Sequence, residues 1–181
     1  PLDLINYFIH QQGFPWEKVI GSGGQLDSSR FRTVLGFPGR EVEAYVFGEH
    51  GEDQVPVWGR IMIDGMQVSF SPAEKQSFSE RIRQSSLQVI SKKGGTVFAP
   101  ASNTADMVEA ILKDQRKVMI CSANLQGEYG LEGVSLGVPC ILGRKGIERI
   151  EEWELAAEEL AGLQNAGRKL REFLNGVAKS I

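Results

Sequence analysis

In five stretches of this 181-residue chain, apolar residues recur near the 3.6-residue period of an α-helix. The predicted helices span residues 1–13, 25–35, 72–91, 101–114 and 154–179. Glycines stop the first and the third of them, at Gly13 and Gly94, and Ser102 is suited to capping the fourth just after Pro100. The last stretch has the amphipathic pattern of a helix that packs one face on a core.

Strand patterns lie between these helices, with apolar and polar residues in alternation or in short apolar runs bounded by glycine. The predicted strands and hairpins cover residues 18–24, 41–48, 56–70, 117–123 and 134–146. The segment 56–70 is expected to form a hairpin that turns at Asp64-Gly65. We find no internal repeat and no linker. The sequence predicts one domain of class α+β, with long helices packed on a twisted, mostly antiparallel sheet.

The composition is that of an ordinary globular protein, with 41% hydrophobic and 24% charged residues. A formal net charge of -3 offers neither the basic surface of a nucleic-acid-binding protein nor a long acidic tail, so no nucleic-acid partner is expected. No apolar run reaches membrane-spanning length, and Asp3 stands where a signal peptide would carry basic residues. These features favour a cytoplasmic protein without a membrane partner.

Two cysteines, Cys121 and Cys140, lie in apolar, strand-like runs and lack the spacing of metal ligands. In a reducing cytosol, two buried free thiols are favoured over a disulfide, because a chain of this length can form an adequate core without a cross-link. The sequence predicts no metal site.

A glycine cluster, Gly21-Ser22-Gly23-Gly24, follows a predicted strand and precedes a helix, which is where a phosphate-binding loop would lie. A dinucleotide loop would need a further glycine within the helix, and a nucleoside-triphosphate loop would need Gly-Lys-Ser/Thr. Leu26 follows instead, and no lysine does, so a tight turn is favoured over phosphate binding. No Gly-x-Ser-x-Gly elbow supports a serine hydrolase.

The chain contains two histidines. His10 lies among apolar neighbours in the first helix and is interpreted as a partly buried or surface residue. His50 lies in the glycine-flanked turn 48–51, and Asp27 and Arg30 project from neighbouring positions on one helix face. A histidine oriented by a carboxylate can transfer protons near neutral pH, whereas an Asp–Arg pair on a helix is usually a surface ion pair. The spacing alone leaves both interpretations open.

Four blocks of sequence together resemble the C-terminal half of the lactate/malate dehydrogenase family. In chain order they are GSGGQLDSSRFR (21–32), GEHGEDQVPVW (48–58), GGTVFAPA (94–101) and GEYGLEGVSLGVPCILGRKGIERI (127–150). The first two match the catalytic motifs of the family, and the four blocks extend over most of the chain.

The resemblance implies a role for each candidate residue. His50 would be the general acid/base for the hydroxyl group of a 2-hydroxy acid, and Asp27 would accept a hydrogen bond from its other ring nitrogen. Arg30 would bind the substrate carboxylate in a two-pronged contact that a lysine could not reproduce. Thr96 matches a family position that lines the substrate pocket, although a structural threonine at a strand end is an equally good interpretation.

In this family an N-terminal dinucleotide-binding domain binds NAD or NADP, and none of its motifs occurs in the chain. The resemblance therefore implies that residues 1–181 form a single C-terminal catalytic, substrate-binding domain. We expect that Pro1 lies just after the junction between the two halves, that the chain itself holds no cofactor-binding residues, and that it is inactive alone. The family also implies a homodimer or homotetramer.

Malate and oxaloacetate are favoured over lactate and pyruvate as substrates. The segments GGQLDS, FAPA, LQGEYG and LGVPCILG resemble the lactate-dehydrogenase-like branch of malate dehydrogenases. Glu43 stands where sugar-phosphate-activated lactate dehydrogenases carry an effector-binding histidine, and its charge would repel a phosphate, although Arg32 is retained. Glu52 replaces the aspartate that usually follows the GEHG motif.

Other functions stay open at this point. The chain could be the C-terminal domain of an L-lactate dehydrogenase, or a non-catalytic oligomerisation module that associates through its long helices. An NAD-dependent glycosidase of related fold is less well supported, because such enzymes need metal ligands that the sequence lacks.

Overall fold

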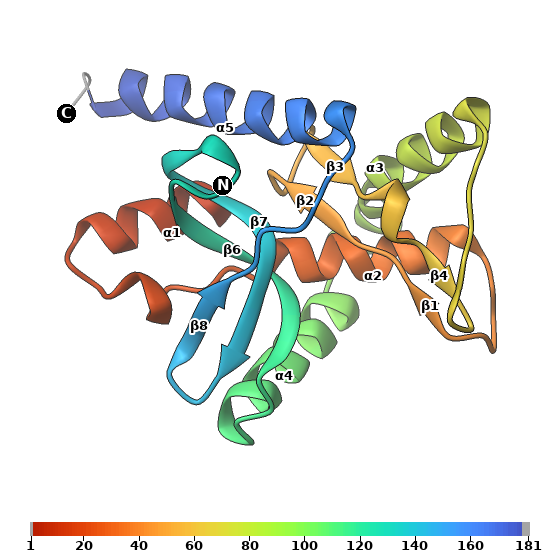
Figure 1. The fold of residues 1–181 in the computed structure, drawn as a ribbon, viewed down its shortest axis with the longest axis horizontal. Coiled ribbons are helices and arrows are strands. Elements are labelled where there is room, and N and C mark those ends of the chain that lie inside the picture. The colour runs from red at the N-terminus through yellow and green to blue at the C-terminus, as the bar shows by residue number, and fades with distance from the viewer. Residues whose placement is uncertain (1, 179–181) are drawn as a thin grey trace.

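The fold is an antiparallel sheet surrounded by helices (Figure 1), in a computed structural model that describes residues 2–178. The α-helices are α1 (Leu2–Gln11), α2 (Gly23–Leu35), α3 (Pro72–Lys93), α4 (Phe98–Leu112) and α5 (Ala157–Ala178). The strands are β1 (Val42–Glu43), β2 (Val46–Gly48), β3 (Gln54–Pro56), β4 (Met62–Ile63), β5 (Met66–Gln67), β6 (Lys117–Gln126), β7 (Glu132–Gly143) and β8 (Gly146–Ile150). Short 3₁₀ helices are η1 (Trp16–Lys18), η2 (Trp58–Arg60) and η3 (Glu128–Gly130). The predicted α+β class is confirmed.

The strands β6 and β7 are the longest of a five-stranded antiparallel sheet, in which four strands follow the order β3-β2-β7-β6 and β8 also pairs with β7. They pair along nearly their whole length, and β8 turns back to pair with the end of β7. Residues 119–125 of β6 are all buried. Because neighbouring side chains in a strand point to opposite faces, this burial requires cover on both faces of the sheet. The helices α1, α2, α4 and α5, which contact β6 or β7, supply it.

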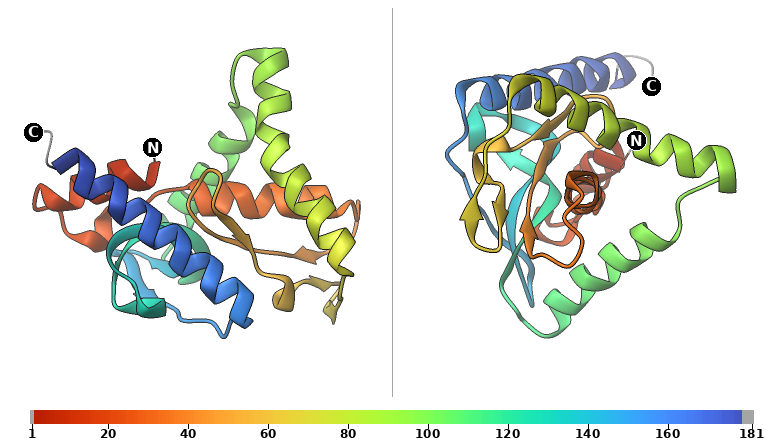
Figure 2. Two further views of the ribbon diagram at one scale, coloured as in Figure 1. Left: turned by 90° about the horizontal axis from the view of Figure 1, so that it is seen from above. Right: turned by 90° about the vertical axis from the view of Figure 1, so that its right-hand side faces the viewer.

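A second, smaller core lies between α2, α3 and a three-stranded sheet of order β1-β4-β5. Phe31 of α2 and Ile82 of α3 are almost fully buried in it. The predicted hairpin turn at Asp64-Gly65 joins β4 to β5, and both residues have the positive φ that such a turn needs. Figure 2 shows that the C-terminal end of α3 and the loop after it project from the rest of the molecule.

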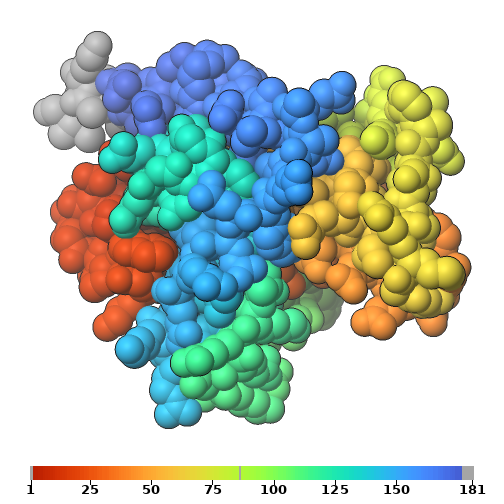
Figure 3. Space-filling model, viewed as in Figure 1, coloured from red at the N-terminus to blue at the C-terminus, as the bar shows by residue number. Residues whose placement is uncertain are grey.

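The first helix packs on the sheet through polar side chains. Asp3 and Asn6 are 2% and 4% exposed, whereas the apolar Ile5 is 55% exposed. The Asn6 amide donates hydrogen bonds to the Val19 and Ser122 carbonyl oxygens, at 2.8 and 3.0 Å, and accepts one from a serine hydroxyl of β7. The helix is where the apolar period predicts it, and Leu4 and Tyr7 pack on the core, but its two buried residues are polar. Figure 3 shows this first segment (red) packed against the β6–β7 region (teal and blue).

Several predicted strand boundaries are wrong. Residues 18–24 form no strand, because the chain turns through η1 and only Gly21 pairs, in an isolated bridge with Ser122. The predicted strand 41–48 is divided between β1 and β2, which belong to different sheets. The prediction also lacks β8 as a separate strand, because the predicted run 134–146 ends at the first residue of β8.

The starts of the last two helices differ most from the prediction. The helix α4 begins at Phe98, so that Pro100 lies in its first turn, where a proline needs no hydrogen-bonded N–H. Ser102 therefore lies within the helix and does not cap it. The last helix begins at Ala157, after an extended stretch from Glu151 to Ala156, and the predicted end at Lys179 lies outside the described residues.

Both cysteines are fully buried and free, as predicted.

Within residues 2–178, no helix combines the length and the apolar character needed to cross a membrane.

The glycine cluster allows α2 to approach the sheet closely. A Cβ atom at Gly21 would lie 2.6 Å from Cβ of Ser122, and a Cβ atom at Gly24 would lie 2.5 Å from Cγ2 of Ile120. Real Cβ atoms do not approach other atoms so closely, so glycine is required at both positions by packing on β6.

Replacing Gly24 by alanine should destabilise the fold. The added methyl group collides with Ile120, and such overpacking costs about 1–3 kcal/mol, which exceeds the gain of up to about 1 kcal/mol from the better helix former. Urea denaturation at neutral pH would measure the change in the free energy of unfolding. The control is Gly59→Ala, because a Cβ atom at Gly59 meets nothing within 4 Å. Equal stability of both variants would contradict the packing argument.

Candidate active site

The turn that carries His50 is fixed by the strand before it. The strand β2 pairs with β3 on one side and with β7 on the other. It ends at Gly48, which has a φ of 90° and where a Cβ atom would lie 2.6 Å from the Asp53 carbonyl oxygen. This residue must therefore be glycine for two reasons, its backbone conformation and the close return of the chain. His50 lies two residues after Gly48, so the end of β2 defines its position.

The helix α2 brings two further predicted residues to this turn. Asp27 accepts a hydrogen bond of 2.7 Å from Nδ1 of His50 through Oδ2, and one of 3.0 Å from Arg30 through Oδ1. The side chain of Asp27 is 2% exposed, that of Arg30 14% and that of His50 26%. An ionised carboxylate only accepts hydrogen bonds, so Nδ1 carries a proton and Nε2 is the ring nitrogen left for another group.

The hydrogen bond to Asp27 is the main cause of a raised pKa at His50, since it stabilises the protonated ring. Partial burial of the ring opposes this shift, and so does the nearby charge of Arg30. The charges of Asp27 and Asp3 add to it. The pKa therefore lies above the ordinary value of 6.5, which suits proton transfer near neutral pH.

Gly23 lets the histidine lie directly against the start of α2. A Cβ atom on Gly23 would be 2.7 Å from both Cβ and Cγ of His50. Any side chain at this position would push the imidazole away from Asp27. The second glycine of the cluster therefore contributes directly to the site, and the pattern of glycines alone does not reveal this.

Arg30 and Thr96 line the same cavity, of about 550 Å³, between α2, the end of α3 and the start of α4. The other lining residues are mostly apolar, among them Val89, Val97 and Phe98. Thr96 lies in the loop between α3 and α4, and not at a strand end. His50 and Asp27 do not line this cavity, so the structure brings Thr96 near Arg30 but not into contact with the histidine.

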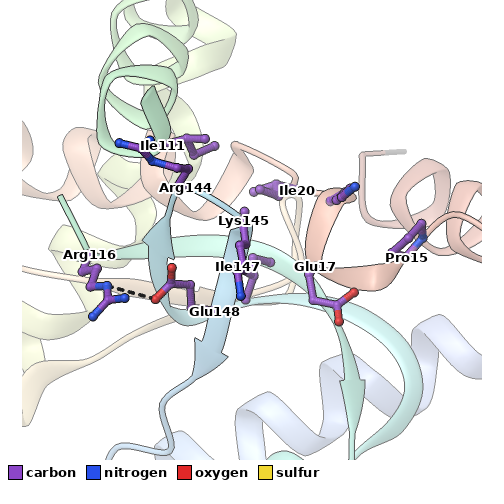
Figure 4. Close-up of a pocket in the computed structure, with 11 residues that line it drawn as sticks. Pro15, Glu17, Ile20, Ile111, Arg116, Arg144, Lys145, Ile147 and Glu148 are labelled. Carbon is purple, nitrogen blue, oxygen red and sulfur yellow. Dashed lines mark ion pairs between the residues drawn. The ribbon is translucent and has the colours of Figure 1, made fainter. Parts of the chain in front are cut away.

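A larger cavity, of about 950 Å³, lies elsewhere, between η1, the α4–β6 turn and the β7–β8 hairpin (Figure 4). Its walls carry charged side chains, including Arg116 and Glu148, which form an ion pair at 3.3 Å. None of the predicted site residues lines it. In the part of the chain that the structure describes, no cluster of three or more His, Cys, Asp or Glu side chains could hold a metal ion.

Asp3 also belongs to this site, although no sequence motif indicates it. Its Oδ2 accepts a hydrogen bond of 2.9 Å from the backbone N–H of His50. An acid in an otherwise apolar helix is a weak signal, because most such acids face solvent. The other histidine, His10, lies apart and has Nδ1 3.1 Å from the Phe14 carbonyl oxygen.

Comparison with known proteins identifies relatives along most of the chain. Residues 24–181 match the family model described as lactate/malate dehydrogenase, alpha/beta C-terminal domain. The malate dehydrogenase of Halobacterium salinarum is 44% identical over 98% of the chain, and that of Bacillus israeli is 38% identical over 98%. The chain spans 60% of the length of each of these curated relatives.

A solved structure agrees with the sequence relatives. The malate dehydrogenase of Archaeoglobus fulgidus, determined in complex with NADH, is similar with a TM-score of 0.88 and 32% sequence identity. The similarity covers 98% of this chain and 59% of that one.

The pKa of His50 predicts a pH-dependent contribution to stability. The folded state holds the imidazole proton more tightly than the unfolded state does, so the stabilisation is fully present below pH 6.5 and is lost as the pH rises through the folded pKa. Urea denaturation of the unchanged protein and of His50→Asn should be compared between about pH 5 and pH 9, which covers the range in which histidine titrates. We expect the substitution to lower the free energy of unfolding more at the acidic end of this range. A difference that does not change with pH would contradict the assignment.

Proposed function

Because the chain belongs to the lactate/malate dehydrogenase family, as its α/β C-terminal domain, we propose that it forms the substrate-binding part of a malate dehydrogenase. The observation that carries this proposal is the buried carboxylate of Asp27, which binds His50 and Arg30 at once. Asp27 thereby holds both the group that transfers the proton and the cation that binds the anionic substrate. The activity is the NAD(P)-dependent interconversion of malate and oxaloacetate.

His50 handles the proton of the substrate oxygen. With Nδ1–H donating to Asp27, the neutral ring presents Nε2 as the acceptor for the hydroxyl proton when malate is oxidised. In the reverse direction, the protonated ring returns this proton to the carbonyl oxygen of oxaloacetate. Asp27 stabilises the imidazolium in both directions and fixes the orientation of the ring.

Arg30 binds the carboxylate next to the reacting carbon. Its contact with Asp27 uses NH1 and leaves other guanidinium N–H groups for a two-pronged contact with the substrate. The low exposure of Arg30 strengthens such a contact, because less water competes for it. Thr96 is proposed as a second lining residue of the substrate pocket, on the basis of the cavity that it shares with Arg30.

The nicotinamide cofactor supplies the hydride acceptor or donor of this reaction. The described residues of this chain offer it no dinucleotide cradle, since the glycine cluster at the start of α2 is packed against β6 and His50. We therefore propose that residues 1–181 are one catalytic, substrate-binding domain, that NAD or NADP binds mainly to a part of the protein outside them, and that these residues alone do not catalyse the reaction. The bound NADH in the Archaeoglobus fulgidus enzyme favours NAD.

Malate is preferred to lactate for two reasons. The relatives compared above are all named malate dehydrogenase. In addition, Arg32 donates to the Ala44 carbonyl oxygen at 3.1 Å, and the neighbouring Glu43 is an anion, so the region suits no phosphate effector of the kind that activates some lactate dehydrogenases. Two buried free thiols fit the reducing cytoplasm that we propose as the compartment.

Substitution of His50 by asparagine should abolish most of the activity. In the full-length protein that contains this domain, we expect NADH-dependent reduction of oxaloacetate to fall by about 10²–10⁴-fold, because a general acid is lost. His10→Asn is the matched control, since it removes the other histidine outside the site, and it should retain full activity.

Arg30→Lys should mainly raise the KM for oxaloacetate, because the charge is kept and the two-pronged contact is lost.

The same assay separates the alternatives. Faster reduction of pyruvate than of oxaloacetate would reassign the domain to a lactate dehydrogenase. No activity on either acid would favour a non-catalytic module, and turnover by residues 1–181 alone would contradict the proposed division between domains.

We also propose that the protein assembles as a homodimer or homotetramer. Large apolar side chains are exposed at the projecting end of α3 and the start of α4, notably Leu87, Val97 and Phe98. Large exposed apolar side chains of this kind are typical of an interface. Sedimentation velocity should show a species larger than a monomer, and a strict monomer at high protein concentration would contradict the proposal.

A further inference from the structure

Asp3 is a buried carboxylate that has no cationic partner among the described residues. It lies in the first turn of α1 and is 2% exposed. Oδ2 accepts the hydrogen bond from the backbone N–H of His50, and Oδ1 accepts one of 2.5 Å from Oγ of Ser122 on β6. Burying a carboxylate is costly unless hydrogen bonds compensate for the lost water, so its retention at this place needs an explanation.

The partner of Asp3 on the sheet is itself held rigidly. Both backbone groups of Ser122 pair with Gly21, at 2.9 and 3.0 Å, and its carbonyl oxygen also accepts from the Asn6 amide. The carboxylate therefore joins three separate segments, namely α1, β6 and the turn of His50. A fixed carboxylate can hold that turn in one position.

The charged groups around the imidazole come from two helices and from the turn itself. The helix α2 contributes Asp27 and Arg30, whose effects on the ring oppose each other, and α1 contributes Asp3. The negative charge of Glu49, next to His50, raises the pKa of Asp3 in addition to the effect of burial. Burial raises the pKa of Asp3 above 3.8, and the hydrogen bonds from Ser122 and His50 oppose this. Asp3 thus has a direct path to influence His50 that does not pass through Asp27.

We propose that Asp3 is a positioning residue for His50, which holds the backbone of its turn against α1 and β6 and whose negative charge stabilises the protonated imidazole. The positioning role of Asp3 rests on the proposed function, in which His50 transfers the proton. The electrostatic coupling does not, because it can be measured without turnover.

The test is Asp3→Asn, which keeps the shape and the hydrogen bonds and removes the charge. The amide oxygen can accept from the His50 N–H, and the amide nitrogen can donate to Ser122 Oγ. The chain has only two histidines, so the ring signals of His50 and His10 can be followed by NMR as the pH is raised. We expect the His50 midpoint to move to lower pH and the His10 midpoint to stay. The alkaline limit of oxaloacetate reduction in the full-length protein should move in the same direction.

The matched control is Glu159→Gln. Glu159 is also a buried carboxylate that accepts from backbone N–H groups, of Trp58 and Ala156, and no described contact joins it to His50. Its replacement removes one charge and should leave the His50 midpoint unchanged. An unchanged midpoint in Asp3→Asn, or an equal shift in Glu159→Gln, overturns the proposal.

A measurement on the unchanged protein covers the case in which Asp3→Asn fails to fold. The carboxyl ¹³C signal of Asp3 should show a step at the pH where His50 titrates, and that of Glu159 should show none. Absence of the step for Asp3 overturns the proposal. If the step is present but the full-length protein does not reduce oxaloacetate, the proposed function fails and the coupling stands.

Discussion

The first turn of α2 lies so close to β6 and to the His50 turn that a single methyl group at Gly23 or Gly24 would collide with them. This approach sets the distance between the helix that carries Asp27 and the turn that carries His50. The 2.7 Å hydrogen bond between them follows from it, as do the burial of the carboxylate and the raised pKa of the imidazole. Packing of helix on sheet and the raised pKa of His50 therefore depend on one constraint, expressed in a cluster of glycines.

Much of this arrangement could be predicted from the sequence, because local patterns determine it. The long helices, the hairpin at Asp64-Gly65 and the paired strands β6 and β7 have periodicities and turn residues that act within a few positions. The placement of Asp27 and Arg30 on one face follows from their spacing alone. The meeting of that face with His50 did not follow from spacing, and only the resemblance to a family suggested it.

The errors have a common physical cause, which is that long-range contacts override local pattern. Residues 18–24 include Val19 and Ile20, which suit a strand, but they begin at the last residue of η1 and only Gly21 pairs, with Ser122. The apolar period of α1 correctly predicts a helix, and Leu4 and Tyr7 pack on the apolar core. The two buried residues of this helix are nevertheless polar, because Asp3 and Asn6 find partners on a strand more than a hundred residues away. No sequence window contains both members of such pairs.

The contact between Asp3 and Ser122 also has a consequence for the order of assembly. His50 is 23 residues from Asp27, but Ser122 is 119 residues from Asp3. During synthesis on the ribosome, the histidine and its carboxylate partner emerge early and close to each other, while the strand that fixes Asp3 emerges much later. Closing the longer loop carries a larger entropic cost and needs β6 in place. Until β6 is in place, Asp3 lacks its hydrogen bond from Ser122, and the His50 turn is not held against α1 and β6 as it is in the folded domain.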